Sequence, residues 1–317
     1  MKKVFYHLGL CVVLVCALLG SLQTQSLRIQ LREGIPERKA VDGKGIVHDL
    51  EETYLLHHYY QETYDSGKPK SYCSDLSVFT AAGQEIRGTV AVNHPMKVGL
   101  WRIYQYDPGV LLLVKNPFLP GVYLGIYLML AAALLLLFDK GLGRNPWLLT
   151  AVLLAVGTGI YLFHGRLLSR ELVPALQSMW YAPHVVVYMV AFTILTGSAV
   201  LALFLLVFPG GNRDKLWQVT DRLTCSGTAF FTVGMLLGSL WAQDAWGTYW
   251  GWDPKETWAA ITWLVYLACI HLRRFRPEWQ KGICLLLLLA YICLHICWWG
   301  INYLPSAIGS SVHTYTN

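Results

Sequence analysis

The chain has 317 residues, of which 55% are hydrophobic and only 14% are charged. Its mean hydropathy is +0.43, and apolar runs of roughly twenty residues recur along it, which excludes a soluble enzyme and is typical of a polytopic membrane protein. The formal net charge of +6 does not indicate nucleic-acid binding, because the basic residues lie in short loops between the apolar runs.

The first apolar run lies at the N-terminus. Lys2 and Lys3 precede the apolar residues 12–19, a pattern that signal peptides share with uncleaved anchors. No small-residue cleavage motif follows, so we favour a membrane anchor over residues 1–22, with His7 near its cytoplasmic end. Cleavage of this run would leave the orientation of the later spans unchanged.

The next region, residues 23–117, is polar and predicts a small extramembrane domain. Apolar positions alternate in residues 76–80 and 85–92, and Gly83 and the His94-Pro95 pair supply turn residues. The second half of this domain is therefore expected to be rich in β-strands.

Six further apolar runs complete the chain. They cover residues 118–138, 147–163, 183–208, 223–241, 258–272 and 283–299, and each is long enough, or nearly so, to cross a bilayer. Together with the N-terminal run they predict an all-α membrane region of about seven transmembrane helices.

The distribution of charge predicts the orientation of these helices. With Met1 in the cytoplasm, eleven basic residues fall in inner loops, and only Arg166, Arg170 and Lys255 fall in the short outer loops. This asymmetry satisfies the positive-inside rule. It places residues 23–116, 165–182, 243–257 and the C-terminal tail on the outer side.

The most informative motif is WGTYWGWDPKETW, residues 246–258, between the fifth and sixth runs. Asp253 suits a helix N-cap, Pro254 the first helical position, and Glu256 the third position of a capping box. Four large rings precede them on a glycine-punctuated turn: Trp246, Tyr249, Trp250 and Trp252. Such rings form belts at membrane interfaces, and an ordered set also suits the face of a flat hydrophobic macrocycle.

This motif resembles the tryptophan-rich WWD signature of the CcsA/ResC haem-handling membrane proteins of cytochrome c biogenesis. In that family the signature faces the extracytoplasmic side, contributes to a haem-binding surface, and is flanked by histidines that ligate the iron. The resemblance implies that haem b contacts a set of residues within the motif, namely Trp246, Tyr249, Trp250, Trp252, Asp253 and Trp258.

A second resemblance concerns residues 92–105, which are similar to the closing segment of the ResB/CcsB partner protein. It implies a shortened ResB-like part, made of the domain at 23–117 and a last transmembrane helix at 118–138. A CcsA-like haem-handling domain would then occupy residues 139–317.

Two pairs of histidines fit the CcsA/ResC pattern. His184 begins the fourth run and His313 lies in the tail, both on the predicted outer side, and the resemblance implies that they are axial ligands of haem iron. His271 ends the sixth run at the cytoplasmic edge, and the resemblance implies that it holds haem transiently, with His7 as its partner. Without the resemblance, interfacial histidines are more often solvated, His271 suits a helix C-terminus, and His7 suits a basic leader region.

These observations predict a protein of cytochrome c maturation in the bacterial inner membrane, with the WWD motif facing the periplasm or the cell exterior. It would bind haem, deliver it to the outer face and present it to the CxxCH motif of an apocytochrome c. Cytochrome c synthase activity, alone or with a separate ResB/CcsB-type protein and a thiol-reducing pathway, stays open. So do a non-catalytic haem-binding or regulatory subunit and a transporter of another flat ligand. The chain has no CxxC pair, so the substrate would supply the reacting thiols.

Overall fold

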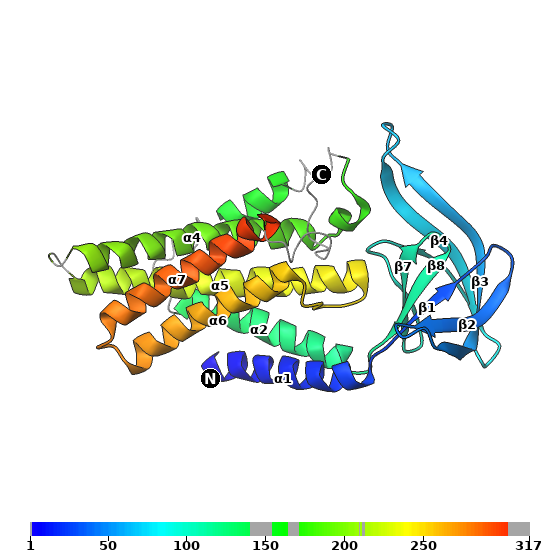
Figure 1. The fold of residues 1–317 in the computed structure, drawn as a ribbon, viewed down its shortest axis with the longest axis horizontal. Helices are drawn as coiled ribbons and strands as arrows, with labels where there is room; N and C mark the ends of the chain where they lie inside the picture. Colours follow the sequence, from blue (N-terminus) through cyan, green and yellow to red (C-terminus); the bar gives the residue numbers. More distant parts are fainter. Residues whose placement is uncertain (1, 140–153, 164–170, 209, 211–212, 304–317) are drawn as a thin grey trace.

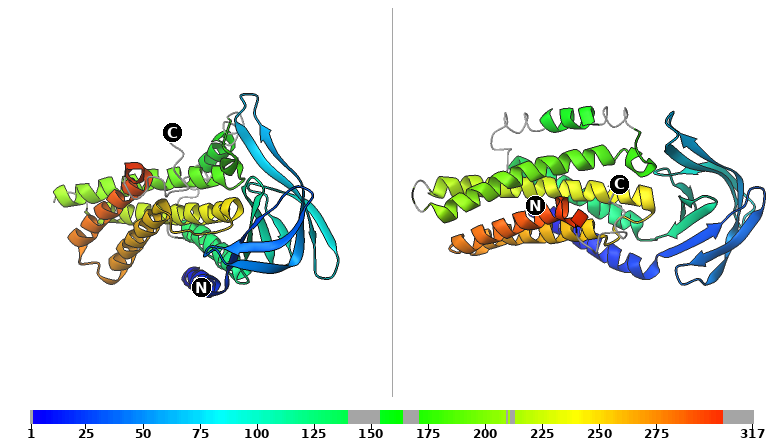
Figure 2. Two further views of the ribbon diagram at one scale, coloured as in Figure 1. Left: turned by 45° about the vertical axis from the view of Figure 1, so that its right-hand side comes forward. Right: turned by 45° about the horizontal axis from the view of Figure 1, so that its top comes forward.

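The computed structural model describes residues 2–139, 154–163, 171–208, 210 and 213–303. It consists of a β domain and a helical bundle (Figure 1). Both views in Figure 2 show the β domain at one end of the bundle, which we call the near end, and the opposite end is the far end.

The β domain is one antiparallel sheet of eight strands in the order β5-β4-β3-β2-β1-β8-β7-β6. The strands are β1 (Gln25–Gln30), β2 (Pro36–Asp42), β3 (Val47–Thr63), β4 (Pro69–Phe79), β5 (Glu85–Ala91), β6 (Met96–Val98), β7 (Trp101–Asp107) and β8 (Val110–Lys115). The sheet curls until β5 at one edge contacts β6 and β7 at the other. Its enclosed face is apolar, with Ile29, Tyr54 and Ile103 fully buried.

Strands occupy both halves of this domain, whereas the sequence predicted them only in the second half. The expected strands at 76–80 and 85–92 correspond to the end of β4 and to β5. The hairpin of β3 and β4 extends past the rest of the sheet as an arm (Figure 1). We call residues 60–70 of this hairpin the β3–β4 arm.

The described helices are α1 (Lys2–Gln23), α2 (Leu119–Asp139), α4 (Tyr181–Val207), α5 (Arg213–Trp246), α6 (Pro254–Phe275) and α7 (Gln280–Trp298), with the 3-10 turns η2 (Pro174–Gln177) and η3 (Gly300–Tyr303). A shorter apolar helix, Leu154–Phe163, lies along α4 (Figure 2). Every predicted apolar run therefore contains a described helix. Among the described residues, four helices are long and apolar enough to cross a membrane, within α1, α4, α5 and α7. The chain is a multi-pass membrane protein, while the count of seven spans and their orientation stay predictions.

Helix α5 is central to the bundle, because it contacts α2, α4 and α6. Its buried threonines donate hydrogen bonds to carbonyls one turn earlier, including Thr232 to Thr228 at 2.8 Å. Trp263 of α6 donates its indole N–H to the Thr232 hydroxyl at 2.9 Å. Within a bilayer, polar groups need partners inside the protein, so these contacts allow polar residues in an apolar helix pair.

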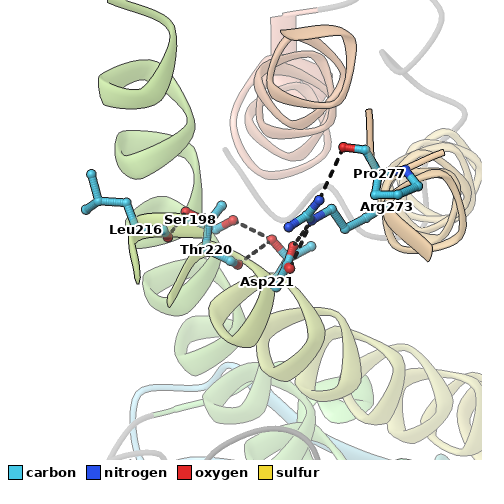
Figure 3. A network of polar contacts seen from close by, with 7 residues as sticks. Ser198, Leu216, Thr220, Asp221, Arg273 and Pro277 are labelled. Carbon is cyan, nitrogen blue, oxygen red and sulfur yellow. Dashed lines mark hydrogen bonds and ion pairs between the residues drawn. The ribbon is translucent and has the colours of Figure 1, made fainter. Parts of the chain in front are cut away.

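An ion pair ties α5 to α6 at the far end (Figure 3). Arg273 Nε lies 3.0 Å from Asp221 Oδ2, and its guanidinium lies 4.6 Å from the ring centre of Trp217. A guanidinium is suited to both contacts, because it forms directional hydrogen bonds and stacks on aromatic faces. This network fixes the end of α6 that carries His271.

Candidate functional site

His184 lies in the first turn of α4 and is held by α5. Its Nδ1 lies 2.8 Å from the carbonyl oxygen of Gly234, so Nδ1–H donates and Nε2 is the nitrogen that can accept a metal in this tautomer. A Cβ on Gly238 would lie 2.6 Å from His184 Cε1 and 2.7 Å from Nδ1. A glycine at 238 is therefore required for the imidazole to sit where it does.

Aromatic rings connect His184 to the tryptophan segment, which we define as residues 246–258. The His184 ring centre lies 4.8 Å from that of Tyr188 and 5.7 Å from that of Trp241. Trp241 is buried and lies 5.1 Å from Trp246, where the tryptophan segment begins. Packing thus fixes the imidazole relative to this segment.

A cavity of about 280 Å³ lies between α4, α5, α6, α7 and the tryptophan segment, and we call it the bundle cavity. Its lining includes His184, Tyr249, Trp250, Lys255 and Trp298. Its volume is near the lower end of ligand pockets, at about 300 Å³. It combines an imidazole, aromatic walls and a cation, which suits a flat apolar ligand that carries a metal and acidic groups.

A second cavity, of about 630 Å³, lies between the β domain and the tryptophan segment, and we call it the interdomain cavity. Tyr104 and Tyr106 of β7 line one side, and Trp246 and Trp252 line the other. Glu256 lines both cavities, so the tryptophan segment is the wall between them.

The backbone of the tryptophan segment is tightly constrained. The predicted capping box is confirmed: the Asp253 side chain accepts from Glu256 N at 2.9 Å, and Glu256 Oε2 accepts from Gly251 N at 2.7 Å and Asp253 N at 3.2 Å. Trp252 is 70% exposed and has a φ of +57°, an outlier for a bulky residue. Its ring lies 5.9 Å from that of Trp250. Strained residues concentrate at functional sites, which favours Trp252 as a contact for a ligand or partner.

The β domain contacts the same segment through Tyr104. Gln243 Nε2 donates to the Tyr104 hydroxyl at 2.8 Å, and each residue is only 2% exposed. Burial raises the pKa of Tyr104 and of Tyr249, so both phenols stay protonated and can donate hydrogen bonds. The Tyr104 ring also covers Gly247, whose φ is +77°. The turn that leaves α5 is therefore braced by the β domain.

The structure also brings His7 and His271 together. Their ring centres are 6.4 Å apart, with the planes nearly perpendicular at 89°. His271 Nδ1 lies 2.8 Å from the Leu267 carbonyl oxygen, which again assigns the proton to Nδ1. These rings belong to the ends of α1 and α6 that point away from the β domain.

Two predicted residues do not join these groups. Trp258 is half-buried in α6, and it is not among the residues that line either cavity. His313 lies outside the described residues, so its relation to His184 stays a prediction.

His295, near the C-terminal end of α7, is not among the histidines that the sequence singled out. Its ring centre lies 4.6 Å from that of Tyr291 and 5.3 Å from that of Phe192. Its position inside an apolar run could have identified it, because ionisable residues within membrane spans often mark functional sites. Cys297 of the same apolar run also lines the bundle cavity.

Two protein-family models match this chain, one over its helical part and one over its N-terminal part. The family model described as "Cytochrome C assembly protein" matches residues 119–308, which is more than half of the chain. The chain belongs to the cytochrome c assembly protein family. The ResB-like family model matches residues 2–112, so this family member carries an N-terminal ResB-like portion.

Curated proteins are similar to this chain over part of its length. The chain is 36% identical over 157 residues to "Cytochrome c biogenesis protein CcsA" of Chlamydomonas reinhardtii, and the alignment covers 46% of this chain and 43% of the relative. Proteins of the same name from Guillardia theta and Synechococcus sp. (strain CC9902) are 33% and 32% identical over 176 and 182 residues; each alignment covers 46% of this chain and 57% or 59% of the relative. The chain thus spans about half the length of the curated relatives it matches.

Proposed function

We propose that this chain acts in cytochrome c maturation by holding haem b in the bundle cavity and presenting it to an apocytochrome c. The observation that carries the proposal is the convergence of His184, Tyr249 and Trp250 on one cavity. The Gly234 carbonyl orients the imidazole, as outer-sphere carbonyls do for metal-ligating histidines. Haem is the cargo of this site, with His184 as one axial ligand and His313 as the other.

The attachment reaction requires orientation more than catalytic side chains. A thiol of the substrate's CxxCH motif adds across a haem vinyl group, so a carbon–sulfur bond forms, the thiol proton moves to the other vinyl carbon and nothing leaves. The aromatic walls of the bundle cavity fix the plane of the macrocycle, and Lys255 provides a cation for its carboxylates. The interdomain cavity, with exposed Trp252 beside it, gives the polypeptide an approach from the β-domain side.

The far-end pair, His7 and His271, would receive haem first. Two imidazoles on opposite sides of one metal have ring centres roughly 6–6.5 Å apart, because each metal–nitrogen bond is about 2.0–2.1 Å. The observed separation of 6.4 Å fits this requirement. The pair then holds haem on the inner side, and His184 holds it on the outer side.

The distribution of basic residues supports the proposed orientation of the bundle in a bacterial inner membrane. Arg213, Arg273 and Arg274 lie at the ends of α5 and α6 away from the β domain, as the positive-inside rule expects of the cytoplasmic side. The β domain and the tryptophan segment then face the periplasm or cell exterior. We also propose that the chain is divided into an anchor at 1–22, a ResB-like part up to 138 and a CcsA-like part from 139. The same proposal includes dependence on a ResB/CcsB-type partner and on a thiol-reducing pathway.

Restoration of cytochrome c maturation tests the proposal. The chain is expressed in a host that lacks its own maturation proteins, alone and with a ResB/CcsB-type protein and a reductant, and haem bound covalently to a reporter apocytochrome is measured after denaturing electrophoresis. We expect attachment with the wild-type chain in at least one background and none with His184→Ala at equal membrane abundance. Haem bound to the chain without attachment in any background would favour the non-catalytic haem-binding subunit instead.

A further inference from the structure

The segment that leads into the His184 helix, residues 171–177, is held by the β domain. Gln177 Nε2 donates to the Lys70 carbonyl of the β3–β4 arm at 2.7 Å, and Asn93 Nδ2 donates to the Pro174 carbonyl at 2.8 Å. The Tyr64 hydroxyl donates to the Leu172 carbonyl at 3.2 Å. Three separate carbonyl contacts therefore connect the two parts of the chain here.

The same segment is also connected to the site. Trp241 of α5 donates its indole N–H to the Ala175 carbonyl at 2.8 Å. Its ring lies 5.0 Å from that of Tyr181, the first residue of α4, and 5.7 Å from that of His184. A shift of residues 171–177 would consequently move the Trp241 ring, which packs against His184, the proposed iron ligand.

Asn93 is suited to this contact by its backbone. It lies in the turn between β5 and β6 with a φ of +64°. Asparagine tolerates this conformation better than most residues. The conformation fixes the direction of a side chain that donates to the Pro174 carbonyl.

The ion pair between Lys68 Nζ and Glu171 Oε2, at 3.2 Å, adds little, because the Lys68 side chain is exposed. The uncharged contacts hold the segment more strongly, above all the partly buried bond that Asn93 donates to the Pro174 carbonyl, because Gln177 is itself exposed.

From these contacts we propose that the β domain positions His184. Asn93 and the β3–β4 arm hold residues 171–177, a set of contacts that we call the clasp, and so fix α4, the helix that carries His184. Gln177 and Asn93 are positioning residues, since neither lines the bundle cavity. The proposal rests on the proposed function only where haem ligation is the readout. In this proposal the ResB-like portion positions the segment that leads into α4 of the same molecule.

Hydrogen exchange of the haem-free full chain tests the clasp directly. In the double variant Gln177→Ala, Asn93→Gly, amides of residues 172–184 should exchange about tenfold faster than in wild type, because the hydrogen bonds of both side chains are lost. The glycine avoids new backbone strain at position 93. Gln61→Ala, an exposed side chain on the arm, is the matched control and should exchange like wild type. Gln177→Ala alone provides a milder variant in case the double variant does not fold.

The absorption spectrum of the haem-loaded protein tests the consequence for His184. We expect the clasp variants to lose part of the low-spin haem bands and to regain them with added imidazole, while Gln61→Ala keeps the wild-type spectrum. Unchanged exchange at 172–184 would overturn the clasp, and so would faster exchange with an unchanged spectrum when His184→Ala does alter that spectrum. If His184→Ala itself leaves the wild-type spectrum unaltered, the ligand assignment fails, and the exchange measurement still decides the clasp.

Discussion

Replacing Gly238 by alanine gives a sharp test of how His184 is held. The new Cβ would lie 2.6 Å from Cε1 and 2.7 Å from Nδ1 of the imidazole, whereas carbon contacts are optimal at about 3.5–4.0 Å. The ring must therefore move by roughly 1 Å, which breaks its hydrogen bond to the Gly234 carbonyl.

The expected free-energy change combines three effects. Overpacking costs about 1–3 kcal/mol, the lost hydrogen bond about 1 kcal/mol, and replacing glycine within a helix returns at most about 1 kcal/mol. Gly238→Ala should thus lower the free energy of unfolding by about 1–4 kcal/mol, the sum of these effects. Gly157→Ala is the control, because no described atom lies within 4 Å of a Cβ there.

Denaturant unfolding in detergent micelles and the haem absorption spectrum would be measured on both variants. Gly238→Ala should lose stability and low-spin haem bands together, whereas Gly157→Ala should be as stable as wild type or slightly more so. Equal stability and equal spectra for the two variants would refute the close packing of His184 on α5.

Three further substitutions probe separate parts of the structure. Thr232→Val removes the acceptor of the Trp263 indole N–H and should lower the free energy of unfolding by about 1 kcal/mol; an unchanged melting temperature would contradict that contact. Trp252→Gly relieves a left-handed backbone, so stability should stay within about 1 kcal/mol of wild type while cytochrome maturation is lost, and retained maturation would argue against a role for this ring. Asp221→Ala leaves Arg273 without its carboxylate partner and should lower the melting temperature measurably, with less effect in Asp221→Asn; equal melting temperatures for both would contradict the ion pair.

Local chemistry explains what the sequence predicted correctly. The capping box at Asp253 and Glu256 depends on residues three positions apart, so spacing alone was sufficient. The apolar runs likewise mark helices, because a helix that crosses a membrane needs about twenty predominantly apolar residues in succession.

The strands of the first half of the β domain were missed because β3 exposes one face. Leu50, Tyr54 and Leu56 are buried, while histidines, tyrosines and acidic residues lie between and beyond them. Because so many residues of β3 are polar, the alternation of buried and exposed positions around Tyr54 and Leu56 was not recognisable in the sequence.

The candidate site was only partly predictable. His184 and the tryptophan segment were chosen through a family resemblance, and the structure places His184 beside Tyr249 and Trp250 in one cavity. The Gly234 carbonyl and Gly238 could not be foreseen, because their contact with His184 depends on how α5 packs against α4. The hold of the β domain on residues 171–177 depends on long-range contacts of the same kind.

The most direct test of the central claim is the absorption spectrum of the detergent-purified protein, expressed with ample haem. Wild type would be compared with His184→Ala and with a His184→Ala, His313→Ala double variant, each checked for folding by circular dichroism. We predict a six-coordinate, low-spin bis-histidine signal in wild type that weakens in the folded single variant and falls further in the double variant. A folded double variant with the wild-type spectrum, or a wild-type protein that carries no haem, would contradict it.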